Sequence, residues 1–173
     1  MKKEISITIN GEIYEQSVPI RLLLVDFIRD VAGLTGTHVG CTFEGVCGAC
    51  TIHLDDEAVK SCLMLAVQAD GRSITTIEGL EQKGTLHPLQ SAFIEHDGFQ
   101  CGFCTSGQIM SAVAMIAEAR AGWPSAASAD VRIPFTLTHL SRAEIRERMS
   151  GNLCRCACYP NIVDAVAEVV ARS

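Results

Sequence analysis

Residues 101–104 read Cys-Gly-Phe-Cys and residues 154–156 read Cys-Arg-Cys, and these two stretches decide how the second half of the chain folds. Neither stretch can complete a four-thiol site alone, so both need a common partner that draws the two segments together. An earlier set poses the same requirement with a different spacing, and its members are Cys41, Cys47, Cys50 and Cys62. We therefore predict two four-cysteine sites, each holding one iron–sulfur cluster, in an electron-carrying protein.

The composition favours thiol ligands over disulfides. The 173 residues include nine cysteines, an odd number that leaves one thiol unpaired in any all-disulfide scheme. The alternating residues 4–9 are neither a secretory signal nor a membrane span, so we expect a cytoplasmic protein with reduced thiols. The formal charge of −6, without a basic run, argues against nucleic-acid and anionic-membrane partners.

The first half reads as a small α+β module with a mixed sheet. Ile5, Ile7 and Ile9 share one strand face, and Asn10-Gly11 predicts a tight hairpin turn before a second strand through about Val18. A helix is expected over residues 21–31, with Gly33 as its stop, because apolar residues recur at helical spacing. The stripe consists of Leu24, Phe27, Ile28 and Val31.

Beyond that helix the first half continues as a glycine-containing cysteine loop over residues 40–50. A strand over 51–54, a turn at Asp55-Asp56, a segment over 58–65 that returns Cys62 to the loop, and a strand over 73–77 should follow. The polar residues 81–85 predict a domain boundary, which gives domains at 1–80 and 81–173.

The second half predicts four helices in a compact bundle. The first starts at His87-Pro88 and runs to about Asp97, and the second runs from an N-cap at Ser106 to about Ala121. Residues 122–140 predict a long surface excursion. A capping box at residues 141–144 opens a helix to about Met149, and the last helix covers 161–171. The expected inward face of the second helix is Ile109, Met110, Val113, Ala114 and Ala117.

The first cysteine set has the spacing C-x5-C-x2-C-x11-C, close to the C-x4-C-x2-C and distant fourth cysteine that hold a 2Fe-2S cluster in plant-type ferredoxins. Such a loop points backbone N–H groups at the sulfurs. Gly40, Gly45 and Gly48 let the backbone come that close without a side-chain clash.

The second set places its cysteines at the entries to two helices, where free N–H groups and the helix dipole favour thiolates. Gly102 and Arg155 lie within this set and are expected beside its cluster. Structural zinc is the alternative for either set, although zinc sites use paired Cys-x2–4-Cys knuckles that Cys-x-Cys fits poorly. Cys158 lies outside both sets and is expected to be a free buried thiol. The five histidines lack metal spacing and are expected to have structural roles.

These motifs resemble the small iron–sulfur subunit of the molybdenum hydroxylase (xanthine oxidase) family. The resemblance spans nearly the whole chain and rests mainly on residues 34–37, 40–41, 47–51, 74–80, 100–105 and 150–156. Within the family, residues 86–90, 93–99 and 144–149, together with the 122–140 excursion, are most similar to bacterial heterotrimeric aldehyde oxidoreductases.

The resemblance implies a plant-type ferredoxin-like (β-grasp) domain followed by a four-helix-bundle domain, each with a 2Fe-2S cluster. It implies a large partner subunit with a molybdenum pterin cofactor, and a medium subunit with FAD. By similarity Gln100 and Cys156 would contact the pterin. Three departures from the family are the fifth residue between Cys41 and Cys47, Ser106 in place of proline, and Ala157-Cys158-Tyr159 in place of Thr-Gly-Tyr.

The leading hypothesis is therefore the electron-transfer subunit of an aldehyde-oxidising molybdenum enzyme, with no catalytic residue of its own. Oxidation of N-heteroaromatic compounds by the complex is the runner-up. A free two-cluster ferredoxin and a zinc-stabilised interaction module are the alternatives from other classes.

Overall fold

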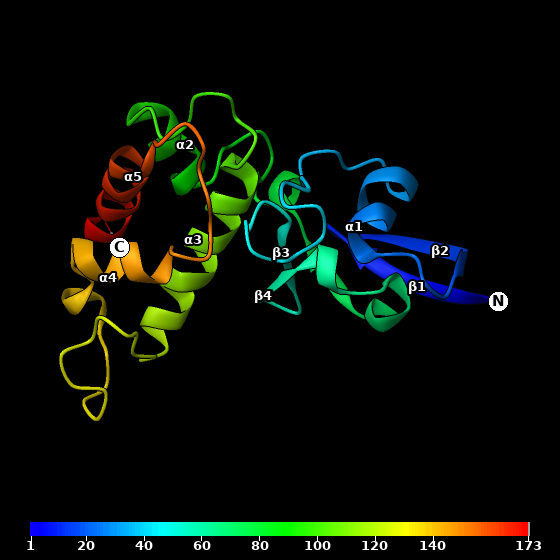
Figure 1. The fold of residues 1–173 in the computed structure, drawn as a ribbon, viewed down its shortest axis with the longest axis horizontal. Coiled ribbons are helices and arrows are strands. Elements are labelled where there is room, and N and C mark those ends of the chain that lie inside the picture. The colour runs from blue at the N-terminus through cyan, green and yellow to red at the C-terminus, as the bar shows by residue number, and fades with distance from the viewer. Residues whose placement is uncertain (173) are drawn as a thin grey trace.

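The structure, a computed structural model, describes residues 1–172, and they form two halves arranged along the long axis of the molecule (Figure 1). A β-sheet with short helices makes up the first half, and helices make up the second. The mixed sheet and the later helices confirm the predicted α+β class. None of the helices in residues 1–172 has the length and apolar character to cross a membrane.

The N-terminal hairpin folds as predicted. Strand β1 (Lys2–Ile9) pairs antiparallel with β2 (Glu12–Pro19), and Asn10 and Gly11 both have positive φ, of 52° and 87°. Two positive φ values in a two-residue loop are what a type I′ hairpin turn requires. Ile5, Ile7 and Ile9 are at most 4% exposed, and each such buried side chain contributes about 1.5–3 kcal/mol.

The sheet has the strand order β2-β1-β5-β3-β4. Strand β3 (Thr51–Leu54) forms a second hairpin with β4 (Glu57–Lys60), and β5 (Ser73–Thr75) lies between β1 and β3. The β1–β5 pair is parallel and the other pairs are antiparallel, so the sheet is mixed as predicted. Asp55 and Asp56, both with positive φ, form the predicted turn.

The helix over the sheet is less regular than its sequence stripe predicts. It begins as α1 (Leu24–Asp26) and continues as a π-helix over Phe27–Val31, in which the N–H of Ala32 donates to the carbonyl of Phe27 at 3.0 Å. Leu24, Phe27 and Ile28 are fully buried against the sheet, as predicted. The prediction for Val31 is wrong, because the wider π turn rotates it out of the stripe and leaves it 40% exposed.

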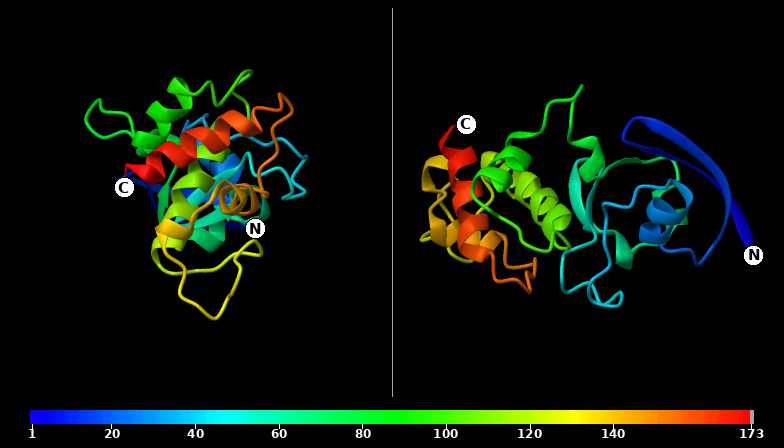
Figure 2. Two further views of the ribbon diagram at one scale, coloured as in Figure 1. Left: turned by 90° about the vertical axis from the view of Figure 1, so that its left-hand side faces the viewer. Right: turned by 90° about the horizontal axis from the view of Figure 1, so that it is seen from above.

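The helical half contains α2 (Pro88–Glu95), α3 (Thr105–Arg120), α4 (Arg142–Arg148) and α5 (Tyr159–Ala171). Helix α5 packs on α2 and α4, and α2 also contacts α3 (Figure 2). His87 caps α2 as its position before Pro88 predicts, through an N–H···Nδ1 bond from Leu89. Short 3₁₀-helices lie at Ser61–Leu63, Ala66–Ala69, Ile77–Gly79 and Leu137–His139.

Helix α3 lies on the side of the helical half that faces the sheet, and this position corrects two predictions. Its N-cap is Cys104, so Ser106 lies inside the first turn, where its hydroxyl is buried without a hydrogen-bond partner among residues 1–172. Ala117 is exposed instead of inward. One side of α3 contacts β3 and another contacts α2, so two faces are buried and a single stripe does not describe the helix.

Residues 122–140 form the predicted surface excursion, which projects beyond α3 and α4 (Figure 1). Two of its side chains, Phe135 and Leu140, turn inward and are at most 9% exposed. At its end the Ser141 hydroxyl accepts from the N–H of Glu144 at 3.3 Å, which confirms the predicted N-cap of α4. The reciprocal half of the capping box does not form, because the Glu144 carboxylate accepts hydrogen bonds from the excursion.

Candidate iron–sulfur sites

The first four thiols meet at the end of the sheet half that faces α3. Cys41 and Cys47 lie in the 40–50 loop, Cys50 directly precedes β3, and Cys62 lies in a 3₁₀ turn after β4. The thiol of Cys62 contacts that of Cys50, and the thiol of Cys41 contacts that of Cys47. The Ser61 hydroxyl donates to the Cys50 carbonyl at 2.8 Å and fixes the turn that carries Cys62.

The loop directs its peptide N–H groups at these sulfurs, as expected for a loop that surrounds a cluster. The N–H of Cys47, followed by those of Val46 and Glu44, lowers the pKa of the Cys41 thiol to about 7. Burial and the neighbouring Cys50 thiol raise the pKa of Cys62, against the N–H of Gly45, which donates to its sulfur. These N–H groups suit sulfurs that carry negative charge, the form in which thiols bind iron.

The second four thiols also meet, although two segments fifty residues apart supply them. The thiol of Cys101 contacts that of Cys156, and the thiol of Cys104 contacts that of Cys154. Cys154 is buried, Cys104 and Cys156 are half-buried, and Cys101 is exposed. The structure therefore brings together the Cys-x2-Cys and Cys-x-Cys stretches as predicted.

The expected lowering of thiol pKa values at the helix entries is seen at Cys101 and Cys154 but not at Cys104 or Cys156. The N–H of Phe103 lowers the pKa of Cys101, and N–H groups of Cys158 and Cys156 lower that of Cys154 against its burial. Burial instead raises the pKa of Cys104 to about 12, although Cys104 is the N-cap of α3. Desolvation of a thiolate opposes the helix dipole, and at Cys104 desolvation is the larger effect.

The predicted glycines and polar residues of the two sites lie in different surroundings. A Cβ on Gly40 would come within 3.1 Å of the Cys47 sulfur, and a Cβ on Gly45 would clash with Leu63 at 2.5 Å. Gly48 is close to the helical half, since a Cβ there would meet Asn152 and the carbonyl of Gly151 at 2.5 Å.

Gly102 has a φ of +78° in the turn between Cys101 and Cys104. Gln100 and Arg155 are exposed beside the second set.

The two cysteine sets are joined by hydrogen bonds to main-chain carbonyls. The N–H of Leu153, next to Cys154, donates to the carbonyl of Cys47 at 2.9 Å. The side-chain amide of Asn152 donates to the carbonyl of Gly48 at 3.3 Å. One hydrogen bond and short stretches of main chain therefore separate a cysteine of the first set from one of the second.

Sequence reasoning missed Tyr159 as part of the second site. Its hydroxyl accepts from the N–H of Cys154 at 2.8 Å and fixes the turn between the Cys-x-Cys stretch and α5. The pattern Cys-x4-Tyr carries no recognised signal.

The histidines have structural contacts, as expected. His53 Nε2 bonds to the Met110 carbonyl at 2.8 Å, and His38 stacks on Phe103 with ring centroids 4.6 Å apart.

The thiol arrangement bears on the choice between zinc and a two-iron cluster. Structural zinc sites use paired Cys-x2–4-Cys knuckles, which the Cys-x-Cys stretch of the second set does not provide. Backbone N–H groups donate to the sulfurs of Cys41 and Cys154, and such N–H groups suit the negative charge on the ligand sulfurs of an iron–sulfur cluster. The donor set of four thiols with these N–H groups therefore fits a 2Fe-2S cluster.

Comparison with known proteins agrees with this chemistry. Residues 7–79 match the family described as 2Fe-2S iron-sulfur cluster binding domain, and residues 76–167 match the [2Fe-2S] binding domain. The caffeine dehydrogenase subunit gamma of Pseudomonas sp. (strain CBB1) is 52% identical over 95% of this chain and 89% of its own. The aldehyde oxidoreductase iron-sulfur-binding subunit PaoA of Escherichia coli (strain K12) is 47% identical, over 95% of this chain and 70% of its own.

The chain belongs to the iron–sulfur subunits of the molybdenum hydroxylase family. Among solved structures, quinoline 2-oxidoreductase from Pseudomonas putida 86 superposes with a TM-score of 0.80 at 45% identity. That match covers 99% of this chain and 98% of the other. Membership of this family confirms the resemblance that the cysteine motifs predicted.

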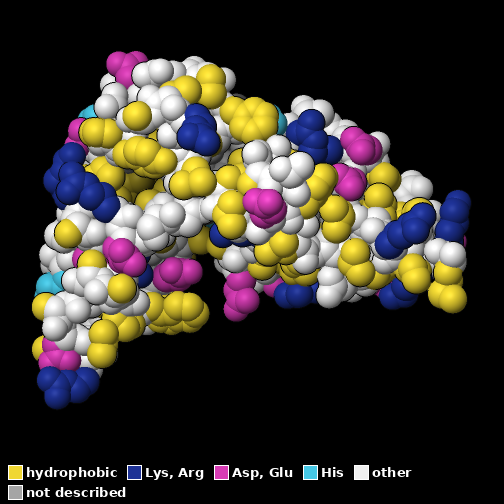
Figure 3. Space-filling view, viewed as in Figure 1, with side chains coloured by type: hydrophobic (Ala, Val, Ile, Leu, Met, Phe, Trp, Pro, Cys, Tyr) yellow, Lys and Arg dark blue, Asp and Glu magenta, His cyan; other side chains and the backbone are white. Residues whose placement is uncertain are grey.

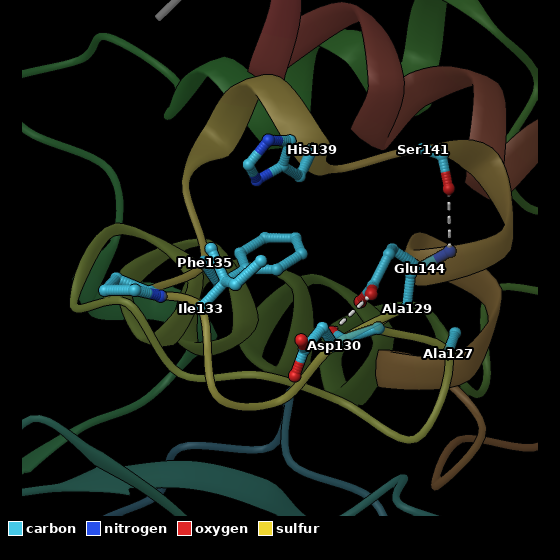
Figure 4. A pocket seen from close by; sticks show the side chains of 10 residues that line it. Ala127, Ala129, Asp130, Ile133, Phe135, His139, Ser141 and Glu144 are labelled. Atoms are coloured by element: carbon cyan, nitrogen blue, oxygen red, sulfur yellow. Dashed lines mark hydrogen bonds between the residues drawn. The ribbon is translucent and has the colours of Figure 1, made fainter.

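Outside the cysteine sites, this molybdenum hydroxylase subunit has a cavity of about 350 Å³ under the excursion (Figure 4). Phe135, His139 and Glu144 line it, and no cysteine does. On the face shown in Figure 3, charged side chains of both signs are interspersed and hydrophobic patches lie over both halves. The subunit's basic residues therefore form no continuous surface on this face.

Proposed function

We propose that this chain relays single electrons from a molybdenum pterin cofactor in a large subunit to FAD in a medium subunit, as the non-catalytic electron-transfer subunit of an oxidoreductase. Each 2Fe-2S cluster, when bound, takes up and releases one electron at a time. The observation that carries the proposal is the hydrogen bond from Leu153, the neighbour of Cys154, to Cys47, which connects the two cysteine sets through a short stretch of main chain.

Under this proposal all eight cysteines of the two sets are iron ligands. Cys41, Cys47, Cys50 and Cys62 would hold the cluster of the sheet half, within a ferredoxin-like β-grasp domain over residues 1–80. Cys101, Cys104, Cys154 and Cys156 would hold the other, within a four-helix-bundle domain over residues 81–173. The thiol contacts within each set support this assignment.

Exposure supports the proposed order of partners. At the second set Gln100 and Arg155 are exposed and Cys156 is half-buried, which supports the proposed contacts of Gln100 and Cys156 with a pterin held by the large subunit. Leu153 and Tyr159 at the same site are 50% and 44% exposed. At the first site Val46 and Leu63 are 57% and 60% exposed, and we assign this apolar surface to the FAD subunit. We place the complex in the cytoplasm.

We propose an aldehyde as the substrate of the assembled enzyme, oxidised to a carboxylic acid in the large subunit. The aldehyde oxidoreductase subunit PaoA supports this class. N-heteroaromatic oxidation is the second candidate, and the names of caffeine dehydrogenase and quinoline 2-oxidoreductase favour it. Turnover of the purified complex against an aldehyde panel and a heteroaromatic panel separates the two.

The relay is tested by iron content, paramagnetic resonance and a Cys101→Ser variant. We expect about four irons per chain and two distinguishable 2Fe-2S signals after reduction. Cys101→Ser should remove or alter one signal, leave the other, and block electron flow from substrate to FAD. About two irons or none, unaltered signals in the variant, or unchanged reduction of an acceptor downstream of FAD would each contradict the proposal. Purification without two larger chains would favour a free carrier.

A further inference from the structure

Cys158 is the one cysteine that neither four-thiol set uses, yet it lies against the second set. It is the N-cap of α5 and is 5% exposed. Its sulfur lies 3.9 Å from the carbonyl oxygen of Cys156. Its thiol also contacts the thiol of Cys154, and its backbone N–H donates to the Cys154 sulfur. The backbone of Cys158 therefore fixes its side chain beside a proposed ligand.

The Cys158 thiol has two acceptors within reach, and charge decides between them. The Cys156 carbonyl is neutral, whereas Cys154 as an iron ligand is a thiolate. Hydrogen bonds to ionised acceptors are roughly twice as strong as neutral ones, so the S–H donates to Cys154. Cys104 also contacts the Cys154 thiol, but as a proposed ligand it has no proton to donate. Cys158 is not among the proposed iron ligands, and a thiol that binds no metal keeps its proton at neutral pH because its ordinary pKa is about 8.5.

We propose that Cys158 acts through Cys154 as a hydrogen-bond donor that raises the reduction potential of the cluster in the helical half. Reduction adds one electron, whose charge spreads onto the ligand sulfurs, and a donor at such a sulfur stabilises the reduced form more than the oxidised form. No bond forms or breaks, and the proton stays on Cys158. The inference rests on the proposed function, because it needs Cys154 as a ligand.

Packing is the competing explanation, since Cys158 also belongs to the apolar core of the helical half with Ile162 and Val163. Free cysteine commonly packs as a small hydrophobe. The variants separate the two roles. Cys158→Ala keeps an apolar side chain and removes the donor, whereas Cys158→Ser keeps a donor of similar shape. Cys158→Gly removes the side chain altogether and also lacks the donor.

The test is a redox titration of the assembled enzyme, followed by the paramagnetic signal that Cys101→Ser removes or alters. At a fixed solution potential we expect the ratio of reduced to oxidised cluster to fall about three- to tenfold in Cys158→Ala and Cys158→Gly, up to about 59 mV for a one-electron couple. Cys158→Ser should retain the wild-type ratio or exceed it. The signal of the first cluster should keep its potential in all three variants and is the internal control.

Three results would overturn the inference. An unchanged potential in Cys158→Ala means that the S–H donates elsewhere. Equal falls in the Ala and Ser variants mean that Cys158 acts by packing. Loss of the second signal in Cys158→Ala means that Cys158 is itself needed to hold iron. The proposed function fails separately, when Cys101→Ser leaves both signals unaltered, so the two failures are distinguishable.

Discussion

At the scale of single residues, Gly107 allows the two halves to approach each other. A Cβ at this position would lie 2.2 Å from the Gly48 carbonyl oxygen and 2.8 Å from the Cα of Ala49, both main-chain atoms of the first cysteine loop. Main-chain atoms cannot move aside as the end of a flexible side chain can. The absence of a side chain at Gly107 thus sets how closely α3 packs on the loop.

Gly107→Ala should therefore destabilise the protein, although alanine ordinarily stabilises a helix by about 0.5–1 kcal/mol relative to glycine. Overpacking of about 1–3 kcal/mol outweighs that gain. The loss should appear as a lower midpoint of thermal unfolding, followed by the visible absorption of the iron–sulfur clusters. Ala117→Ser, which adds one atom on the exposed side of the same helix, is the matched control and should stay within about 0.5 kcal/mol of wild type. A higher midpoint in Gly107→Ala would show that the first cysteine loop moves aside without a loss of stability.

At the scale of elements, the 122–140 excursion is held by the first and last turns of α4. The Glu144 carboxylate accepts from the hydroxyls of Ser125 and Ser128, both at 2.6 Å, and from Arg148 Nε at 3.2 Å. Arg148 also donates to the Trp123 carbonyl at 2.6 Å and lies over the Phe135 ring. Burial alone would raise the pKa of Glu144, but these hydrogen bonds and the Arg148 charge hold it below its ordinary value of 4.5.

Glu144→Gln should loosen the excursion, since it weakens three charge-assisted hydrogen bonds at a net cost of about 1–3 kcal/mol. Faster limited proteolysis within residues 122–135 is the expected result. A lowered folded pKa means that the contribution of the carboxylate is complete above about pH 4.5 and is lost as the pH falls through the folded pKa. The difference from wild type should therefore be the same at pH 5.5 and pH 8. Glu147→Gln removes the same charge from the exposed side of α4, and the protease should cleave this variant at the wild-type rate.

The elements also show how much of the structure can be predicted from the sequence alone. Local signals were sufficient where the conformation is decided locally, as in the Asn10-Gly11 turn and the Ser141 cap, and the cysteine spacing predicted both groups of thiols. Predictions failed where packing decides, at Val31 in the π turn and at Ala117 on α3. A helical stripe assumes one buried face, which does not hold for a helix that contacts both halves of the molecule. Tyr159 was missed because its hydroxyl bonds to a backbone N–H, which leaves no spacing pattern in the sequence.

At the scale of the whole molecule, three hydrogen bonds to main-chain carbonyls join the halves within residues 1–172. His53 Nε2 donates to Met110, the Asn152 amide to Gly48, and the Leu153 N–H to Cys47. An electron relay needs this interface between the halves to be rigid, because the rate of electron transfer depends on the distance between the two centres. We therefore expect electron transfer to depend more on this interface than on the interior of either half.

Asn152→Asp tests this requirement. Asn152 is 6% exposed, and the variant replaces its donor with a carboxylate that faces the Gly48 carbonyl. Leaving the new carboxylate and the Gly48 carbonyl without hydrogen-bond donors should cost about 1–3 kcal/mol at the interface between the halves. In the assembled enzyme we expect substrate to reduce the helical-half cluster as in wild type and the sheet-half cluster more slowly, as followed by rapid freezing and paramagnetic resonance. Asn161→Asp is the matched control, since it breaks amide bonds to His96 and Asp97 within the helical half alone. If both variants slow the sheet-half cluster equally, general destabilisation explains the effect, and if neither does, the Asn152 bond does not hold the two sites in register.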